Sequence, residues 1–400
     1  MLGVYAEQFK SDGSNSVVGR KGRLFMEICK PKKTTRKQLS LDFDLRPGTV
    51  SSIVLELIEQ GLVSEGRPEA PYRKGRPEIL LRPATSRLAA IVFYVVSQSI
   101  HAVLVGFGGE EIGTAVSEVQ AENVENDSLK HLIVDMAKNL INQASPETEI
   151  VGISFSLPGI VEENAMRWVF ASRWTKIRNL DLSQIADELK LPVIVSKNLN
   201  CELRARITRK SEFKDSSILF VRWGFGIGAS LFLNGSAVVA GNGGFGEIGH
   251  SYIGCDEDNL CRCGMKNCLE TKAALWALLP RLRAVYPDIP EDEWSFEAFL
   301  KEREDFDINL LDEAIQLMAV AMQNLTLILS PHQIVLSGPF VQHPAVFQKL
   351  NDRFRELLPS NSRVLAQREI TVAVSRAGTE DEITGAAYPL FERALKSLCR

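Results

Sequence analysis

Three cysteines gathered within eight positions constrain the fold of this chain more than any other feature. Cys261, Cys263 and Cys268 follow His250, with ten, one and four residues between successive members. One imidazole and three thiolates complete the tetrahedral shell of a zinc ion and leave no position for water, so the spacing predicts a structural zinc site. Free buried thiols are the alternative, and Cys255 is a lower-ranked spare ligand.

The size and composition are typical of a soluble protein with more than one domain. The chain has 400 residues, of which 45% are hydrophobic and 24% are charged. A single core rarely grows beyond about 250 to 300 residues, so two or three domains are expected. No apolar run approaches the roughly 18 residues of a membrane helix, and the first twenty residues lack the apolar segment of a secretory signal. These features predict a cytoplasmic protein without membrane contact.

Charge is unevenly distributed along the chain. Residues 1–85 contain 15 Lys and Arg against 10 Asp and Glu, whereas the remainder contains 31 against 40. A basic N-terminal module suits contact with nucleic-acid phosphates, and the acidic remainder has no such requirement. Chance asymmetry is an alternative that the counts alone leave open.

The N-terminal segment predicts a first helix from Arg23, a short second helix and a longer third helix. Pro31 ends the first helix because its ring removes an amide donor, and Thr34 or Thr35 can cap the second. Pro47 suits the first turn of the third helix, and Gly61 suits its left-handed end. The third helix carries apolar residues at three- and four-residue spacing, which predicts a buried stripe: Val50, Ile53, Val54, Leu57 and Ile58.

The start of the third helix and a basic loop are the predicted DNA contacts. Two short strands, residues 62–65 and 78–81, form a hairpin, so residues 23–85 are expected to be a winged helix-turn-helix behind a flexible tail of residues 1–22. Recognition helices contact base edges with their first residues, and basic loops contact phosphates. The expected residues are Arg46, Gly48, Thr49, Ser51 and Ser52 on the helix and Arg67, Arg73, Lys74 and Arg76 on the loop. A three-helix packing module that binds no DNA is the alternative.

From Leu88 onward, apolar runs alternate with helical segments, which is typical of an α/β protein. Early apolar runs such as residues 88–96 and 216–223 are expected strands, with an amphipathic helix between them. A glycine-bearing segment from Gly224 to His250 precedes the cysteines. The later expectations are helices at residues 270–285, 294–304, 309–329 and 385–398 and strands at residues 333–337 and 370–373.

A longer motif around the cysteines resembles a known family. Residues 246–250 (GEIGH) followed by residues 261–270 (CRCGMKNCLE) are similar to the signature of the ROK family of repressors, open reading frames and sugar kinases. The resemblance covers residues 88–400, and the head resembles the winged helix-turn-helix of the repressor branch. It implies an actin/hexokinase-like (ribonuclease H-like) body of two lobes around a sugar cleft. The implied first lobe is residues 88–203 plus about 375–400, and the second, with the zinc site, is residues 204–374.

Two positions depart from what the family's kinases need. The kinase phosphate loop, Asp-x-Gly-Gly-Thr, aligns with residues 94–98, where Tyr94 replaces the acid and no glycine is present. The kinase Asn-Asp pair, whose aspartate is the general base, aligns with Asn198 and Leu199, and leucine cannot accept a proton. The resemblance therefore implies a chain that is not an enzyme.

The remainder of the family's sugar site is retained as hydroxyl-binding groups. The resemblance implies sugar contacts from Asn198, Glu247, His250 and Glu270, with the histidine binding zinc through one ring nitrogen and the sugar through the other. Alternatively, the two glutamates only fix the zinc loop. The family's asparagine before a tryptophan has no counterpart near Trp174, where Ser172 and Arg173 stand, which points to an atypical ligand or to none.

Together these features predict a DNA-binding transcriptional regulator. The expected form is a homodimer or homotetramer that represses genes of carbohydrate uptake or metabolism on a double-stranded DNA operator. A sugar or sugar phosphate in the cleft would control it by preferring one of two conformations. The alternatives are control by a protein partner from the sugar-uptake system, a sugar kinase with an added domain, and an architectural protein whose body only oligomerises.

Overall fold

The structure is a computed structural model, and it describes residues 17–30, 32–66, 79–120, 123–209, 216–233, 236–254, 258–303, 305–358 and 370–398. Pro31, Cys255 and the predicted loop residues Arg67, Arg73, Lys74 and Arg76 lie outside these ranges. Within the described ranges, no helix combines the length and apolarity that crossing a membrane would need.

The head packs helices α2 (Val17–Cys29), α3 (Arg36–Asp42) and α4 (Pro47–Glu59) with antiparallel strands in the order β1 (Thr34–Thr35), β3 (Leu80–Pro83), β2 (Val63–Glu65). As predicted, Thr35 caps α3 by accepting a hydrogen bond from the amide of Gln38 at 3.2 Å, and Pro47 occupies the first turn of α4. Gly61 has the predicted left-handed backbone, with φ +70°. The first helix starts at Val17, so the prediction that it begins at Arg23 behind a flexible tail of residues 1–22 is wrong for residues 17–22. Lys21 in this added segment is buried and forms an ion pair with Glu56 of α4.

The first lobe is built on a sheet with strand order β11-β7-β4-β5-β6. Its strands are β4 (Leu88–Val96), β5 (Ser99–Gly106), β6 (Glu111–Glu118), β7 (Glu149–Leu157) and β11 (Val193–Lys197). Side chains alternate between the two faces, so Ile91 packs toward α5 (Asn126–Gln143) and α6 (Ser183–Leu189), whereas Val92 packs toward α14 (Glu380–Leu398). A smaller antiparallel sheet of β8 (Ile160–Glu162), β9 (Arg167–Phe170) and β10 (Leu180–Asp181) lies beside it.

The second lobe is built on a sheet with strand order β14-β13-β12-β15-β16. Its strands are β12 (Ile218–Trp223), β13 (Ile227–Leu233), β14 (Ser236–Ala237), β15 (Gln333–Ser337) and β16 (Thr371–Val374). The helices that pack with it are α8 (Glu270–Ala273), α9 (Leu275–Arg283), α10 (Glu293–Glu302), α11 (Asp312–Leu329), α12 (Pro339–Gln342) and α13 (Pro344–Leu357). The single helix predicted over residues 270–285 is wrong, because Ala274 has extended backbone (ψ 150°) and separates α8 from α9.

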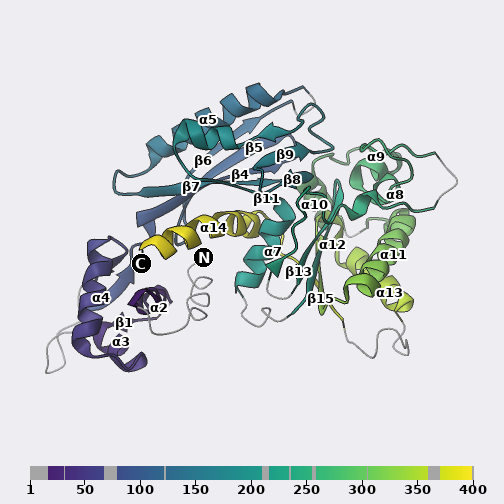
Figure 1. Ribbon diagram of the computed structural model, residues 1–400. Coiled ribbons are helices and arrows are strands. Elements are labelled where there is room, and N and C mark those ends of the chain that lie inside the picture. The colour runs from purple at the N-terminus through teal and green to yellow at the C-terminus, as the bar shows by residue number, and fades with distance from the viewer. Residues whose placement is uncertain are drawn as a thin grey trace.

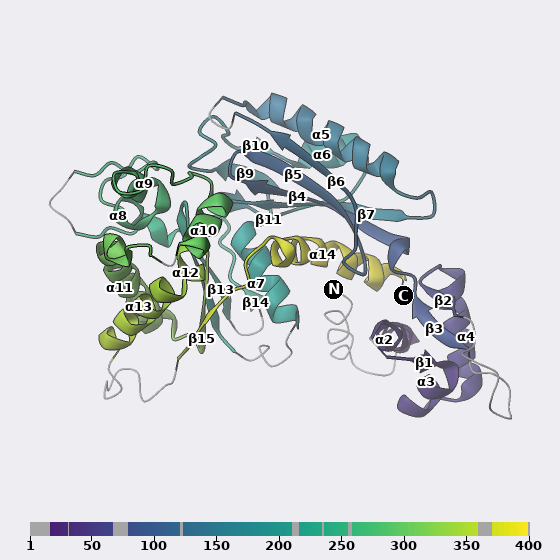
Figure 2. The same cartoon turned by 180° about the vertical axis from the view of Figure 1, so that it is seen from behind.

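Helices α7 (Asn198–Arg209) and α14 lie between the two sheets, as Figures 1 and 2 show. The predicted two-lobed α/β architecture is thereby confirmed. The head packs against the first lobe and the C-terminal half of α14, where Phe107 contacts both Phe25 and Phe391 at centroid distances of 5.9 and 5.5 Å. Gln60 at the end of α4 also donates a hydrogen bond to the carbonyl of Leu398 at 3.2 Å. A single helix therefore extends from the space between the lobes to the head.

Candidate metal centre and interlobe cleft

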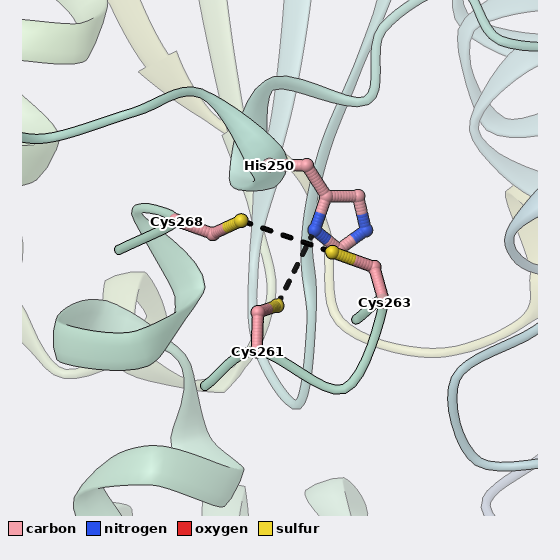
Figure 3. A group of neighbouring side chains, drawn as sticks. All are labelled: His250, Cys261, Cys263 and Cys268. Carbon is pink, nitrogen blue, oxygen red and sulfur yellow. Dashed lines mark hydrogen bonds between the residues drawn. The ribbon is translucent and has the colours of Figure 1, made fainter. Parts of the chain in front are cut away.

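The structure brings the predicted metal ligands together. One ligand atom from each of His250, Cys261, Cys263 and Cys268 lies within 4.8 Å of all the others. Figure 3 shows the four side chains pointing toward a common centre from the end of a short 3-10 helix (Ile248–His250), a loop and the start of α8. This cluster could hold one metal ion.

Tight turns in the backbone produce this convergence. The amide of Gly264, with φ +92°, donates to the carbonyl of Cys261 at 2.9 Å, and the amide of Cys261 donates to Met265 at 2.8 Å. Bridges between Tyr252 and Cys268 and between Leu260 and Lys266 hold the two sides of the loop together. A glycine at position 264 is needed because other side chains rarely adopt this positive φ.

Burial affects the protonation of the thiols. Burial and the neighbouring thiol of Cys263 raise the pKa of Cys261 to about 11, and burial and Cys261 also raise the pKa of Cys268. In the absence of a cation these thiols are protonated at neutral pH. A metal ion that binds them as thiolates must therefore displace protons.

A cleft between the lobes contains all four residues that the family resemblance assigns to a sugar. Asn198 lies at the start of α7, Glu247 precedes the 3-10 helix, His250 ends that helix, and Glu270 begins α8. The cavity measures about 200 Å³, which suits a small molecule. The structure thus places these residues together, and their contact with a ligand stays a prediction.

The imidazole of His250 lies between the metal cluster and the cleft. Its Nδ1 is 3.6 Å from the Sγ of Cys261, and its Nε2 is 3.8 Å from a carboxylate oxygen of Glu247. Glu247 is also paired with Lys197, whose ammonium group donates to the carbonyl of Phe245 at 3.1 Å. Because His250 is close to both Cys261 and Glu247, a movement of the metal loop would shift these side chains in the cleft.

Besides Glu247, two more of the predicted sugar contacts have partners within the chain. Glu270 accepts hydrogen bonds from the amide of Ile227 at 2.8 Å and from the indole of Trp276 at 3.2 Å. Asn198 accepts a hydrogen bond from the amide of Leu199 at 2.9 Å. These contacts agree with the alternative in which Glu270 fixes local geometry, although further lone pairs remain for a ligand.

The two positions that depart from the kinase pattern also lie at this cleft. Residues 94–98 form the end of a tight β4–β5 hairpin, in which Ser97 has φ 55° and Val96 pairs with Ser99. Leu199 is 3% exposed and packs near the backbone of Gly228, where an added Cβ would lie 3.0 Å from it. The Leu199 side chain is therefore an apolar group that packs at the edge of the cleft.

A network of charged residues in the cleft was missed by sequence reasoning. Arg222 contacts Glu293 at 3.1 Å, Glu202 at 3.5 Å and the hydroxyl of Ser337 at 3.4 Å. Glu382, on the first turn of α14, accepts a hydrogen bond from Ser156 at 2.6 Å. The available signal was Arg222 itself, because it interrupts an otherwise apolar strand at residues 218–223.

Burial sets the protonation of this network. Burial, together with the charge of Glu202, raises the pKa of Glu382 to about 8. Burial also raises the pKa of Glu202, although Arg222 opposes the shift. For Glu293 the same penalty of burial is outweighed, because Arg222 and the amide of Phe225 hold its pKa below the ordinary value.

The predicted DNA-contacting face of α4 is open to solvent. Arg46, Gly48, Ser51 and Ser52 are exposed, and Thr49 is partly exposed. The apolar stripe of the same helix faces inward, with Val50, Ile53, Val54 and Leu57 buried as predicted. No described residue of the head covers the first turn of α4 on its exposed side, as the exposure of these side chains shows.

Comparisons with known proteins agree with this architecture. A putative xylose repressor of Caldicellulosiruptor sp. strain Rt8B.4 is 28% identical over 320 residues, covering 78% of each chain. The DNA-binding transcriptional dual regulator NagC of Escherichia coli strain K12 is 24% identical over 392 residues, covering 90% of this chain and 89% of NagC. The crystal structure of a ROK family transcriptional regulator, a homolog of the E. coli MLC protein, superposes with a TM-score of 0.71 at 19% identity and covers 96% of this chain and 97% of that one. The ROK family model matches residues 103–392, and this chain belongs to the ROK family.

Proposed function

We propose that this chain is a DNA-binding transcriptional repressor of genes for carbohydrate uptake or metabolism, controlled by a sugar-related ligand in the interlobe cleft. The observation that carries the proposal is the exposed first turn of α4, where Gly48, Thr49, Ser51 and Ser52 offer small and hydroxylic groups suited to a major groove. The similarity to a regulator structure supports it, because that match extends over the head as well as the body.

The proposed DNA site consists of two half-sites. A homodimer or homotetramer presents pairs of heads, and half-sites read by such pairs lie about one helical turn apart or a multiple of it. Arg46 would contact base edges with the first turn of α4, and the basic loop residues Arg67, Arg73, Lys74 and Arg76 would contact phosphates, as the sequence predicts. Because the proposed target is a DNA operator, we propose that the protein acts in the cytoplasm.

We propose that the cleft binds its ligand but does not transfer a phosphoryl group to it. Asn198, Glu247, His250 and Glu270 supply donors and acceptors for hydroxyl groups at one cavity. Leu199 provides no base to remove a hydroxyl proton, and the hairpin at residues 94–98 has no glycine through which backbone amides could approach a phosphate. A sugar kinase is therefore the weaker hypothesis.

Zinc is the proposed metal, in a structural role. For tetrahedral zinc, bond lengths near 2.3 Å to sulfur and 2.0–2.1 Å to nitrogen require separations of about 3.8 Å between sulfurs and about 3.6 Å between sulfur and nitrogen. Cys263 and Cys268 are 3.8 Å apart at their sulfurs, and Cys261 is 3.6 Å from the ring nitrogen of His250. The donor set suits this ion, and these two separations have the dimensions that it requires, while all four ligand atoms lie within 4.8 Å of one another.

A protein partner is the second candidate for the controlling ligand. The loop that carries the metal ligands exposes large apolar side chains, with Tyr252, Leu260 and Met265 accessible over 72%, 68% and 53% of their surface. Apolar side chains gathered on one loop favour contact with another protein. Such a partner would act on the cleft through His250.

Selection of binding sites from random double-stranded DNA by the full chain tests the proposal. We expect a palindromic site, and we expect the double substitution Thr49→Ala, Ser52→Ala to relax the preference at inner positions by about 1–3 kcal/mol per base pair. Ser295→Ala, at an exposed position of α10 in the second lobe, is the matched control and leaves the site unchanged. Failure to enrich any site would refute the DNA-binding proposal.

A further inference from the structure

An exposed stripe runs along α4 on the side opposite its buried residues. Gly48, Ser52, Leu55 and Glu59 follow one another at spacings of four, three and four residues, and all of them are exposed. Residues at these spacings lie on one side of a helix and project together. Figures 1 and 2 show α4 at the outer edge of the head, away from the second lobe. The stripe is therefore accessible, and it continues beyond the first turn that the sequence predicts as a DNA contact.

The third member of this stripe differs in chemistry from the first two. Leu55 is 52% exposed, and no other large apolar side chain of α4, a helix that the structure describes in full, is exposed to this degree. Leu55 also takes no part in the apolar core of the head. Single exposed leucines are common on protein surfaces, so it is the place of Leu55 on the proposed DNA face that calls for a role.

The small residues ahead of Leu55 allow the helix to approach the floor of a major groove. Gly48 lies in open space, with no atom within 4 Å of an added Cβ, and Ser51 and Ser52 add only short side chains to the exposed turn. Leu55 follows Ser52 by three residues, which is about 4.5 Å along the helix axis and roughly one base-pair step. Its longer side chain can therefore reach the base edges next to those that face Ser52.

Acidic residues mark where the contact with DNA ends. Glu59 follows Leu55 on the stripe and is exposed, and phosphates repel a carboxylate at close range. Glu56, the neighbour of Leu55 in sequence, is directed toward the head itself by its ion pair with buried Lys21 at 3.4 Å. Leu55 is thus the last side chain of the stripe that suits a groove lined with phosphates.

A leucine can recognise one chemical group on the edges of the base pairs. Its side chain neither donates nor accepts hydrogen bonds, and the apolar group that the major groove presents is the C5-methyl of thymine. Contact between the two removes apolar surface of both partners from water. Thymine is thereby favoured over the other bases at the position that Leu55 faces.

We infer that Leu55 is a specificity-determining residue that recognises the methyl group of a thymine at one position of each half-site. The inference rests on the proposed function and extends its recognition surface by one turn of α4. Thr49 and Ser52 contact the neighbouring positions through their hydroxyl groups, whereas Leu55 contacts its position through apolar surface.

Exchange of thymine for uracil tests the inference, because uracil lacks only the C5-methyl. The full chain is titrated by anisotropy with the operator that it selects from random DNA and with copies that carry uracil at one thymine of each half-site in turn. We expect one of these exchanges, next to the positions relaxed by Thr49→Ala, Ser52→Ala, to have an effect. It should weaken binding about 15-fold, which is about fourfold for the methyl group lost from each half-site.

Substitution of Leu55 locates the effect. Leu55→Ala should weaken binding to the thymine operator, and the uracil exchange should then change the affinity of this variant by less than about twofold. Leu41→Ala is the matched control, because Leu41 is 69% exposed on α3 and lies off the stripe; this variant should keep the full response to uracil. Metal content and melting temperature establish that both variants fold.

Three results would contradict the assignment. Retention of the full uracil response by Leu55→Ala would overturn the inference, because the methyl group would then act through DNA shape or through another residue. A selected operator in which no single exchange weakens binding would overturn it as well, and both results would leave the regulator proposal intact. Failure to select any operator would refute the DNA-binding proposal and this inference together.

Discussion

Two parts of the interlobe cleft differ in how they are built. At the metal end, His250 joins a cluster whose other members lie within 18 positions along the chain, and the residues that the family resemblance assigns to a sugar line the cleft beside it. In the charged part of the cleft, the contacts are not encoded by any short motif, because they join separate elements: Arg173, Glu202, Arg222, Glu293 and Glu382. One part is built from a short stretch of the chain, and the other is a network of charge pairs between separate elements.

This difference indicates that ligand binding and phosphoryl transfer can be separated within one cleft. On the proposed function, ligand binding needs only the polar groups that lie together near His250 in the cleft. Phosphoryl transfer needs a base and an anion cradle, and Leu199 and the hairpin at residues 94–98 supply neither. On the proposed function, the body would respond to a ligand through the position of the lobes and of α14 without phosphorylating that ligand.

Loss of a metal ligand should have the largest effect. Cys268→Ser removes a buried ligand, so we expect it to abolish metal binding and to lower the free energy of unfolding by several kcal/mol. Metal analysis and denaturant titration measure both quantities. Met265→Ala changes an exposed side chain of the same loop and should retain the metal. A Cys268→Ser chain with unchanged stability would show that the cluster does not hold the lobe together.

The charged part of the cleft predicts a dependence of stability on pH. Because burial and Glu202 raise the pKa of Glu382 to about 8, the folded chain keeps a proton that the unfolded chain releases near its ordinary pKa of 4.5. The free energy of unfolding should therefore fall as the pH rises from about 5 to about 8, by a few kcal/mol, and Glu382→Gln should flatten this fall.

Glu380→Gln, at an exposed position in the same turn of α14, is the control for that experiment. Groups that face Glu382, namely Ser156, Glu202, Arg222 and Glu293, are unchanged in both variants. Chemical denaturation across this pH range measures the slopes. Identical slopes in the wild-type chain and Glu382→Gln would remove this residue from the explanation.

Loss of the contact between Arg173 of the first lobe and Phe225 of the second lobe should lower stability less than the changes above. Arg173→Ala removes the guanidinium from Phe225, and we expect a loss of about 1 kcal/mol in stability with a more open arrangement in small-angle scattering. Arg178→Ala removes a comparable contact with Phe170 within the first lobe, at 4.5 Å, and should leave the scattering profile unchanged. An unchanged profile for Arg173→Ala would exclude a bridging role.

Placing the aspartate of the family's kinases at position 199 should have the smallest effect, because we expect it to give no kinase activity. Leu199→Asp replaces the apolar residue with the base type that the family's kinases use, but the hairpin at residues 94–98 still has no glycine through which backbone amides could approach a phosphate. We expect no sugar phosphate above background in a coupled assay with ATP and glucose. Measurable turnover by this variant would show that position 199 alone separates this cleft from an active one.

The same contrast explains what the sequence could predict. The metal ligands follow from spacing because a tight turn at Gly264 brings close neighbours in sequence together. The helix caps and the buried stripe of α4 follow from local chemistry as well. The network of Arg222 could not be predicted, because Glu202 and Glu293 are brought to it by the packing of α7 and α10 and not by any periodic pattern. The break at Ala274 depends on tertiary packing in the same way.

The most direct test of the central claim follows operator binding and phosphoryl transfer in one sample. The full chain is bound to its selected operator, and a sugar that stabilises the chain is added with ATP while anisotropy and sugar phosphate are measured. The regulator account predicts a change of at least about fivefold in operator affinity and no sugar phosphate above background. Accumulation of sugar phosphate, or an operator affinity that the bound sugar leaves unchanged, would contradict it.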